Sequence, residues 1–196
     1  MARTAEITRT TGETDIRLSL DLDGSGAGTR TTGVGFFDHM LDLFARHGLI
    51  DLHVTTKGDT ETGSHHTVED TGIVLGQAVS EALGDRSGIT RYGHATIPMD
   101  ETLARCAIDL SGRPFTAVNA PQLVHGVTGG FEHELLEEFI RAFANGARAT
   151  VHVDILAGTN AHHIIEGAFK ALARAVRQAV AIDPRESGIP STKGSL

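Results

Sequence analysis

A short motif that pairs histidine with glutamate occurs twice in the sequence. The two copies are His65-His66-x-x-Glu69 and His162-His163-x-x-Glu166. On a helix, residues four apart lie one above the other on one face, so the first His and the Glu of each motif could bind a common metal ion. A single copy could be surface decoration. Two copies with the same spacing predict a matched pair of metal sites.

The second His of each motif points about 100° away around the helix, so we expect it to serve a different ion. His39 and His133, each directly after an acidic residue, are the natural remaining ligands. Three imidazoles and one carboxylate per ion leave two positions of an octahedron open, which suits Mn²⁺ or Fe²⁺ better than tetrahedral Zn²⁺. The predicted division is His65, Glu69, His133 and His163 in one site, and His39, His66, His162 and Glu166 in the other.

The composition is that of an ordinary globular protein, with 40% hydrophobic and 21% charged residues among 196. A net charge of −8 argues against general binding to nucleic acid or to anionic membranes. No apolar run approaches the roughly 20 residues that span a bilayer, and the first ten residues are polar, so the expected location is the cytoplasm. Cys106 is the only cysteine, which excludes an intrachain disulfide and a thiolate metal site.

The whole chain has the form of an internal duplication. Residues 13–24 align with 101–112, residues 37–39 with 131–133, and the two His-His-x-x-Glu motifs with each other. The spacing between the copies changes only by loop insertions. We therefore divide the chain into a first half at 1–88, a second half at 89–182 and a C-terminal substrate-binding tail at 183–196, all within one compact unit.

Hydrophobic periodicity alternates between two and 3.6 residues in each half, which predicts the order β-β-β-α-β-α. The predicted first-half elements are a strand over 16–22, its hairpin partner over 29–35, a helix over 38–46, a strand over 51–56 and a helix over 68–83. The predicted second-half elements are strands over 95–98, 103–110 and 115–119, a helix over 131–143, a strand over 149–156 and a helix over 162–181. We expect an α+β fold in which the helices pack between two four-stranded sheets.

A second group of residues is basic. Arg91, Arg113 and Lys193 are candidates for holding a phosphate, together with Ser191 in the same Ser191-Thr192-Lys193-Gly194 segment, because guanidinium groups, and Ser and Lys on a Gly-rich segment, bind phosphate oxygens. Composition alone slightly favours a disordered terminus for the segment with Ser191 and Lys193. Neither a dinucleotide-binding nor a P-loop motif occurs, so no nucleotide is implied.

Several motifs together resemble the imidazoleglycerol-phosphate dehydratase family. They are Phe36-Phe37-Asp38-His39-Met40-Leu41, the two double-His motifs, Ile97-Pro98-Met99-Asp100-Glu101, Asp109-Leu110-Ser111-Gly112-Arg113-Pro114 and Ser191-Thr192-Lys193-Gly194. The resemblance covers nearly the whole chain, and the departures are small, such as Tyr92 where Phe is usual. It implies a duplicated fold like domain 2 of ribosomal protein S5, two Mn²⁺ per subunit, and a 24-subunit assembly of trimers with sites completed across subunit boundaries.

The resemblance also implies a reaction in histidine biosynthesis. A small phosphate substrate, imidazoleglycerol phosphate, would lose water to give imidazole acetol phosphate without an organic cofactor. Glu13 and Glu166 become acid and base candidates, and Asp100 and Glu101 become further substrate contacts. Arg91, Arg113, Ser191 and Lys193 would hold the phosphate.

Two alternatives use the same ligands. A metal-dependent hydrolase would direct a bound hydroxide at an ester and release inorganic phosphate. A purely structural role would close the coordination sphere and leave Arg113 and Lys193 without a function.

Overall fold

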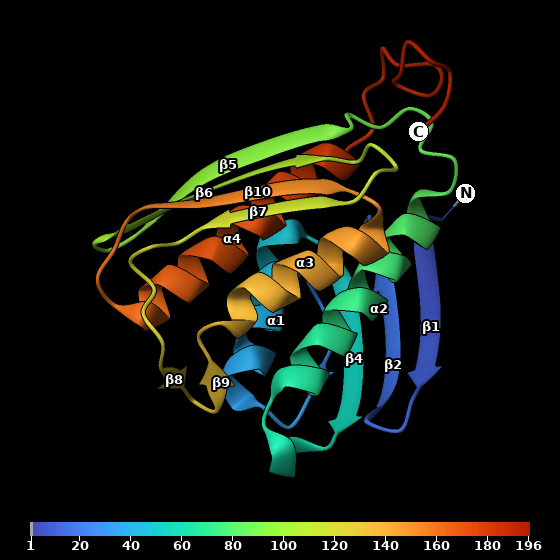
Figure 1. Ribbon diagram of the computed structural model, residues 1–196. Coiled ribbons are helices and arrows are strands. Elements are labelled where there is room, and N and C mark those ends of the chain that lie inside the picture. The colour runs from blue at the N-terminus through green and yellow to red at the C-terminus, as the bar shows by residue number, and fades with distance from the viewer. Residues whose placement is uncertain (1) are drawn as a thin grey trace.

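Two four-stranded sheets enclose a layer of helices in the computed structural model, which describes residues 2–196 (Figure 1). The first sheet has the order β1-β2-β4-β3 and consists of β1 (Thr4–Thr10), β2 (Thr14–Asp21), β3 (Arg30–Thr31) and β4 (Asp51–Gly58). The second has the order β5-β6-β10-β7 and consists of β5 (Tyr92–Met99), β6 (Thr102–Asp109), β7 (Phe115–Asn119) and β10 (Thr150–Ala157). The helices are α1 (Gly35–Gly48), α2 (His65–Leu83), α3 (Leu135–Ala147) and α4 (Ala161–Val180).

The two sheets have the same topology, and each uses strands from one half of the sequence. In both, the short third strand is parallel to the last strand and the other pairings are antiparallel. The predicted order β-β-β-α-β-α occurs in each half. A 3₁₀ turn (Thr60–Thr62) is added to the first half, and a hairpin of β8 (Val127–Thr128) and β9 (Phe131–Glu132) is added to the second. The α+β fold with helices between two sheets is confirmed.

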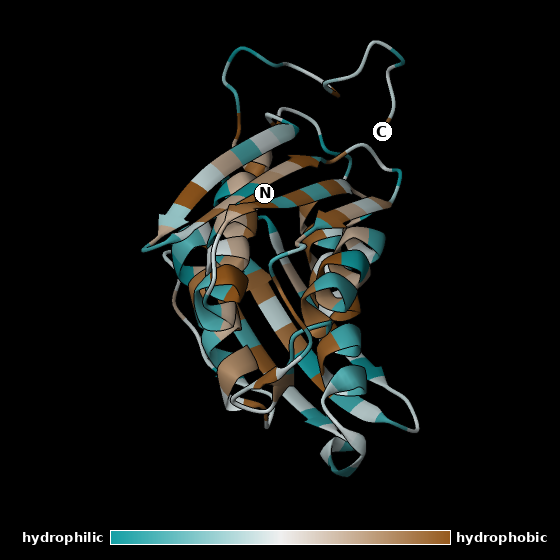
Figure 2. Cartoon of the chain, turned by 60° about the vertical axis from the view of Figure 1, so that its left-hand side comes forward, coloured by the Kyte–Doolittle hydropathy of each residue, from teal (hydrophilic) through white to brown (hydrophobic). Residues whose placement is uncertain are grey.

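The core lies between the sheets and is shared by both halves. Along the strands hydrophobic and hydrophilic residues alternate (Figure 2), which turns one face of each sheet toward the helices. Aromatic rings from α1 meet rings from α3: the ring centroids of Phe37 and Phe139 are 5.5 Å apart, and those of Phe44 and Phe143 are 5.8 Å apart. Such contacts between halves explain why neither half is expected to form a core alone.

The helices α2 and α3 cross with their backbones in contact. A Cβ added at Gly76 would lie 2.3 Å from the carbonyl oxygen of Phe143, and one added at Gly146 would lie 2.4 Å from that of Ile73. Only glycine permits this approach at both positions. The crossing fixes the second half against the helix that begins with the first double-His motif.

Two predicted elements are wrong. The segment 29–35 does not form a hairpin with β2. Its Arg30–Thr31 portion pairs in parallel with β4, because the Asp51 carboxylate accepts hydrogen bonds from the backbone N–H groups of Ser25 and Ala27, at 2.7 and 2.8 Å, and holds the loop beside β4.

The predicted helix over 131–143 begins too early. Gly129 and Gly130 have φ of 56° and 82°, which turns the chain into the β8–β9 hairpin, so Phe131 belongs to a strand and α3 starts at Leu135. His133 therefore lies before α3, whereas His39 lies inside α1.

Two further findings concern composition-based expectations. No helix within residues 2–196 has the length and apolar character needed to cross a bilayer. Cys106 is fully buried in β6, and this burial raises the pKa of its thiol to about 12.

Candidate metal and phosphate sites

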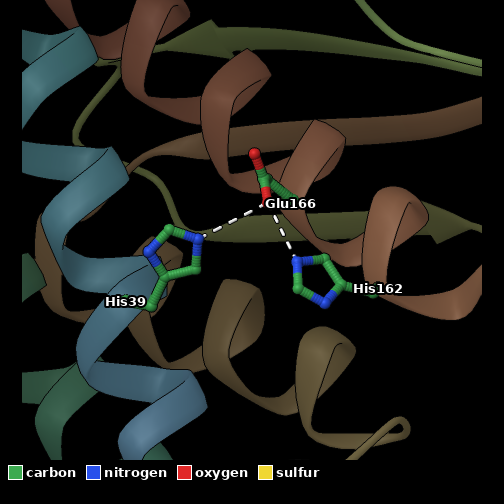
Figure 3. A group of neighbouring side chains, drawn as sticks. All are labelled: His39, His162 and Glu166. Atoms are coloured by element: carbon green, nitrogen blue, oxygen red, sulfur yellow. Dashed lines mark hydrogen bonds and ion pairs between the residues drawn. The ribbon is translucent and has the colours of Figure 1, made fainter.

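His39, His162 and Glu166 converge where α1 lies against α4 (Figure 3). One Glu166 oxygen lies 3.5 Å from Nε2 of His39 and 3.1 Å from Nε2 of His162, and the three donor atoms all fall within 4.8 Å of one another. The carboxylate side chain is 8% exposed and the imidazoles are 47% and 44% exposed. The carboxylate is therefore buried, whereas the two imidazoles beside it are half-exposed.

The start of α4 sets this geometry. The side chain of Asn160 accepts a hydrogen bond from the backbone N–H of His162 at 3.0 Å, which caps the helix just before Ala161. His162 and Glu166 are then one turn apart on the same face, as the spacing predicts.

Glu166 is held in its charged form. Burial raises the pKa of its carboxyl, but the hydrogen bond and charge of Lys170, whose Nζ lies 2.6 Å away, together with His162 and His39, outweigh burial and lower the pKa overall. An ionised carboxylate and two imidazoles aimed at one point fit a divalent first-row metal ion.

The first double-His motif supplies a second, smaller group. Nε2 of His65 lies 3.4 Å from a Glu69 oxygen, and the side chains are 54% and 41% exposed. Within residues 2–196, no third His, Cys or acidic donor lies as close to this pair as His39 lies to His162 and Glu166. One chain therefore presents His65 and Glu69 as an open pair.

The second His of each motif turns aside, as the helix geometry predicts, and each meets a carboxylate through Nδ1. His66 Nδ1 lies 3.0 Å from an Asp59 oxygen, and His163 Nδ1 lies 2.7 Å from a Glu101 oxygen. These hydrogen bonds raise the pKa of both imidazoles. The His163 contact is also the main reason that the pKa of Glu101 is lowered to about 2.

His133 is placed differently from the other candidates. It is 7% exposed, its Nδ1 lies 2.8 Å from the carbonyl oxygen of Val124, and its Nε2 lies 2.9 Å from the hydroxyl of Thr128. Both ring nitrogens thus have partners in the loop before α3. To bind a metal, His133 would have to exchange one of these contacts.

Glu13 and Asp100 lie near the second His of each motif, but more loosely. A Glu13 oxygen is 3.7 Å from Nε2 of His66, and an Asp100 oxygen is 4.0 Å from Nε2 of His163. Their side chains are 56% and 77% exposed. Both carboxylates are therefore accessible to a ligand, unlike Glu101, which is already engaged.

The basic candidates lie near the C-terminal end of α4, away from the His residues at its start. Arg91 binds the Asp109 carboxylate with Nε at 2.7 Å and donates from Nη1 to the carbonyl oxygen of Pro190 at 2.8 Å. The hydrogen bond with Asp109 raises the pKa of the guanidinium. Arg91 thereby fixes the tail immediately before Ser191.

The rest of the tail lies against the turn that carries Arg113. A Cβ added at Gly112 would lie 2.6 Å from the carbonyl carbon of Leu196. The Arg113 side chain is exposed, and the hydroxyl of Ser191 accepts from the backbone N–H of Lys193 at 3.2 Å, which forms a turn. Arg113, Ser191 and Lys193 thus lie in one region of the chain, where the largely buried Arg91 side chain holds the start of the tail.

The metal candidates and the basic candidates are separated by the length of α4. Arg91 donates its backbone N–H to the carbonyl of Ala179 in the last turn, at 2.9 Å, whereas His162 lies in the first turn. At 1.5 Å per residue, His162 and Ala179 are about 26 Å apart. A small molecule cannot contact both regions of the same chain.

Sequence reasoning missed two residues in these groups. Lys170 could have been found, because it lies four residues after Glu166 on the same helix face. Asp59 had no such signal, since it precedes α2 in a loop and reaches His66 only through the fold.

Taken together, these observations define a duplicated α+β protein in which the last helix of each half begins with a histidine–carboxylate pair, and in which His39 joins the pair of the second half.

Comparison with known proteins identifies the family of the chain. The sequence model of imidazoleglycerol-phosphate dehydratase matches residues 32–176. The imidazoleglycerol-phosphate dehydratase of Methylorubrum populi is 59% identical over 195 residues, covering 99% of this chain and all of the relative. The chain belongs to the imidazoleglycerol-phosphate dehydratase family, and it is a hydro-lyase of histidine biosynthesis.

Solved structures of this family have the same fold as the chain. The crystal structure of imidazoleglycerol-phosphate dehydratase from Staphylococcus aureus superposes with a TM-score of 0.83 at 42% identity, covering 92% of this chain and 99% of that one. The enzyme from Pyrococcus furiosus gives a TM-score of 0.84 at 38% identity, covering 97% and 100%.

Proposed function

We propose that the chain dehydrates imidazoleglycerol phosphate to imidazole acetol phosphate with two Mn²⁺ per subunit, and that it does so in the cytoplasm. The observation that carries the metal dependence is the convergence of His39, His162 and Glu166 on one point. The half-exposed imidazoles of His39 and His162 leave room for a further ligand, which favours a catalytic site over a closed structural site.

The proposed ligand sets remain those derived from the duplication. One chain offers His39, His162 and Glu166 to one ion, and His65 with Glu69 to the other. The remaining ligands are His66, His133 and His163. When bound, the metal ions would act as Lewis acids that polarise the imidazole ring of the substrate.

The proton transfers fall to carboxylates. Dehydration removes a proton from C2 and the hydroxyl from C3 of the glycerol chain, and the resulting enol tautomerises to the ketone. Glu13 is exposed and adjacent to His66, so it can approach a substrate bound there. Glu166 is ionised beside Lys170, which suits it to accept rather than to donate a proton.

We propose that Arg91, Arg113, Ser191 and Lys193 hold the phosphate, with Asp100 nearer the metal end as a further contact. Because about 26 Å of α4 separates the two regions, a substrate that uses both must lie between copies of the chain. This supports an assembly in which sites are completed across subunit boundaries, for which we propose the 24-mer of trimers implied by the resemblance.

The first experiment measures formation of imidazole acetol phosphate by purified protein after chelator treatment and after addition of Mn²⁺. We expect activity to disappear on stripping and to return with Mn²⁺. Turnover that persists in rigorously metal-free protein would contradict the metal dependence.

A second experiment tests the shared site. Glu166→Gln and Arg113→Ala chains are each expected to be inactive alone. Co-assembled in equal amounts, they should recover about a quarter of wild-type activity, the fraction of sites that draw an intact residue from each of two copies. No recovery in a verified mixed assembly would mean that one chain supplies both residues.

A further inference from the structure

The second His of each motif contacts, through Nδ1, a carboxylate that is not among the proposed ligands. Asp59 offers both oxygens to Nδ1 of His66, at 3.1 and 3.0 Å, and Glu101 offers one to Nδ1 of His163 at 2.7 Å. In contrast, His65 and His162 face the Glu of their own motif with Nε2. The two classes of His therefore present different nitrogens to their carboxylates.

The two halves reach this contact by different residues. Under the duplication Glu101 corresponds to Glu13, yet Glu13 lies 3.7 Å from the opposite ring nitrogen of His66. Asp59 instead provides the Nδ1 contact in the first half, and its backbone N–H donates to the carbonyl oxygen of Glu13 at 3.1 Å. The two halves thus form the same carboxylate–Nδ1 contact with residues that do not correspond under the duplication. This indicates that the contact itself has a role.

The role follows from imidazole chemistry. A neutral ring carries one proton, and an acceptor at Nδ1 keeps the proton there, which leaves the lone pair of Nε2 free. Metal-binding His residues commonly have such a carboxylate behind them, which also fixes the ring orientation. Glu13 and Asp100 lie on the Nε2 side at 3.7 and 4.0 Å, so without the carboxylate at Nδ1 the proton could move toward them.

We propose that Asp59 and Glu101 are positioning residues, which hold His66 and His163 in the tautomer and orientation that expose Nε2 to a divalent metal ion. This inference rests on the proposed metal dependence. It also replaces the expected role of Glu101 as a direct substrate contact by an indirect one.

Glu101 provides a sharp test because its other oxygen is already fixed. That oxygen accepts from the backbone N–H groups of Thr159 and Asn160 at 3.2 and 2.9 Å. In Glu101→Gln, the amide oxygen keeps these two bonds and the amide NH₂ must face His163. To accept a hydrogen bond from this amide N–H, Nδ1 of His163 must carry its lone pair. The ring proton then lies on Nε2, and Nε2 can no longer bind a metal ion.

Asp59 requires a different variant. Both of its oxygens are within reach of His66, so Asn could still present an oxygen. Asp59→Ala removes the acceptor altogether. Glu61 lies exposed in the same loop, so Glu61→Ala and Glu61→Gln are matched controls for the loss of one negative charge.

The experiment measures Mn²⁺ binding to the assembled, metal-free protein by the electron paramagnetic resonance signal of free Mn²⁺, alongside the melting temperature without metal. We expect Asp59→Ala and Glu101→Gln each to lower the affinity for one of the two Mn²⁺ ions per chain. The expected loss is roughly 10- to 100-fold, the range seen when such supporting carboxylates are removed. The metal-free melting temperature should stay near that of the controls, which separates positioning from folding.

Two outcomes overturn the proposal in distinguishable ways. If the wild type binds two Mn²⁺ and both variants bind as tightly as the Glu61 controls, the positioning role is wrong and the proposed function stands. If the wild type binds no Mn²⁺, the proposed metal dependence fails and the positioning role fails with it.

Discussion

Removal of the Arg86 side chain should destabilise the protein more than the loss of any ion pair on its surface. Arg86 is only 5% exposed and follows α2, at the boundary between the halves. Its guanidinium donates to the carbonyl oxygens of Leu110 at 2.8 Å and Ala147 at 3.0 Å, and to the hydroxyl of Ser80 at 3.2 Å. Burial lowers the pKa of the group, but an arginine remains charged at neutral pH.

The expected cost can be worked out from these contacts. Each buried carbonyl left without a donor costs about 1–3 kcal/mol. With two such carbonyls, and a hydroxyl that water can satisfy, Arg86→Ala should lower the free energy of unfolding by about 2–6 kcal/mol. At about 2–4 °C per kcal/mol for a chain of this size, the melting temperature should fall by roughly 4–24 °C.

The backbone provides an internal check. Arg86 has φ of 65°, a left-handed conformation that costs an L-residue about 1 kcal/mol but costs glycine almost nothing. Arg86→Gly loses the same hydrogen bonds as Arg86→Ala, so we expect it to be the more stable of the two by about 1 kcal/mol.

The assay is thermal unfolding of assembled protein at fixed concentration, followed by circular dichroism. Arg105→Ala is the control, because Arg105 is 53% exposed and pairs with Asp154 at the surface, and its loss should cost less than about 1 kcal/mol. If Arg86→Ala melted within 2 °C of Arg105→Ala, roughly within measurement error, the buried hydrogen bonds would not carry the stability assigned to them.

Three further predictions concern the core and the loops. Gly76→Ala should destabilise the α2–α3 crossing by about 2 kcal/mol or more, since its Cβ would overlap the Phe143 carbonyl, whereas Gly12→Ala, with open space around it, should change the urea midpoint little. Asp51→Ala should lower the melting temperature at neutral pH and progressively less below pH 3.8. Hydrogen bonds, led by the one from the Ser25 N–H, lower the pKa of the Asp51 carboxyl from 3.8. The ionised carboxylate therefore stabilises the fold above that pH, and this stabilisation is lost on acidification. Cys106 should resist a thiol-specific reagent at pH 8 until urea unfolds the chain, because its thiol is buried and its pKa is about 12; labelling of the native protein at the unfolded rate would contradict its burial.

Local geometry explains what the sequence could predict about the candidate site. The contacts of His65 with Glu69 and of His162 with Glu166 follow from helix periodicity alone. The approach of His39 to Glu166 is a tertiary contact, and only the internal duplication pointed to it. The same reasoning misplaced His133, because the Gly-Gly hairpin before α3 interrupts the equivalence of the two halves.

The length of α4 explains why sequence patterns do not show which residues share one site. One end of this helix presents His162 and Glu166, and the other receives the backbone of Arg91, about 26 Å away. A helix is rigid on this scale, so no rearrangement within one chain brings the two ends to one small substrate. Which residues share a site is then a property of the contacts between copies, and periodicity within one sequence carries no record of those contacts. Complementation between Glu166→Gln and Arg113→Ala measures that property directly, because its recovered activity depends on which copies meet and not on how either chain folds.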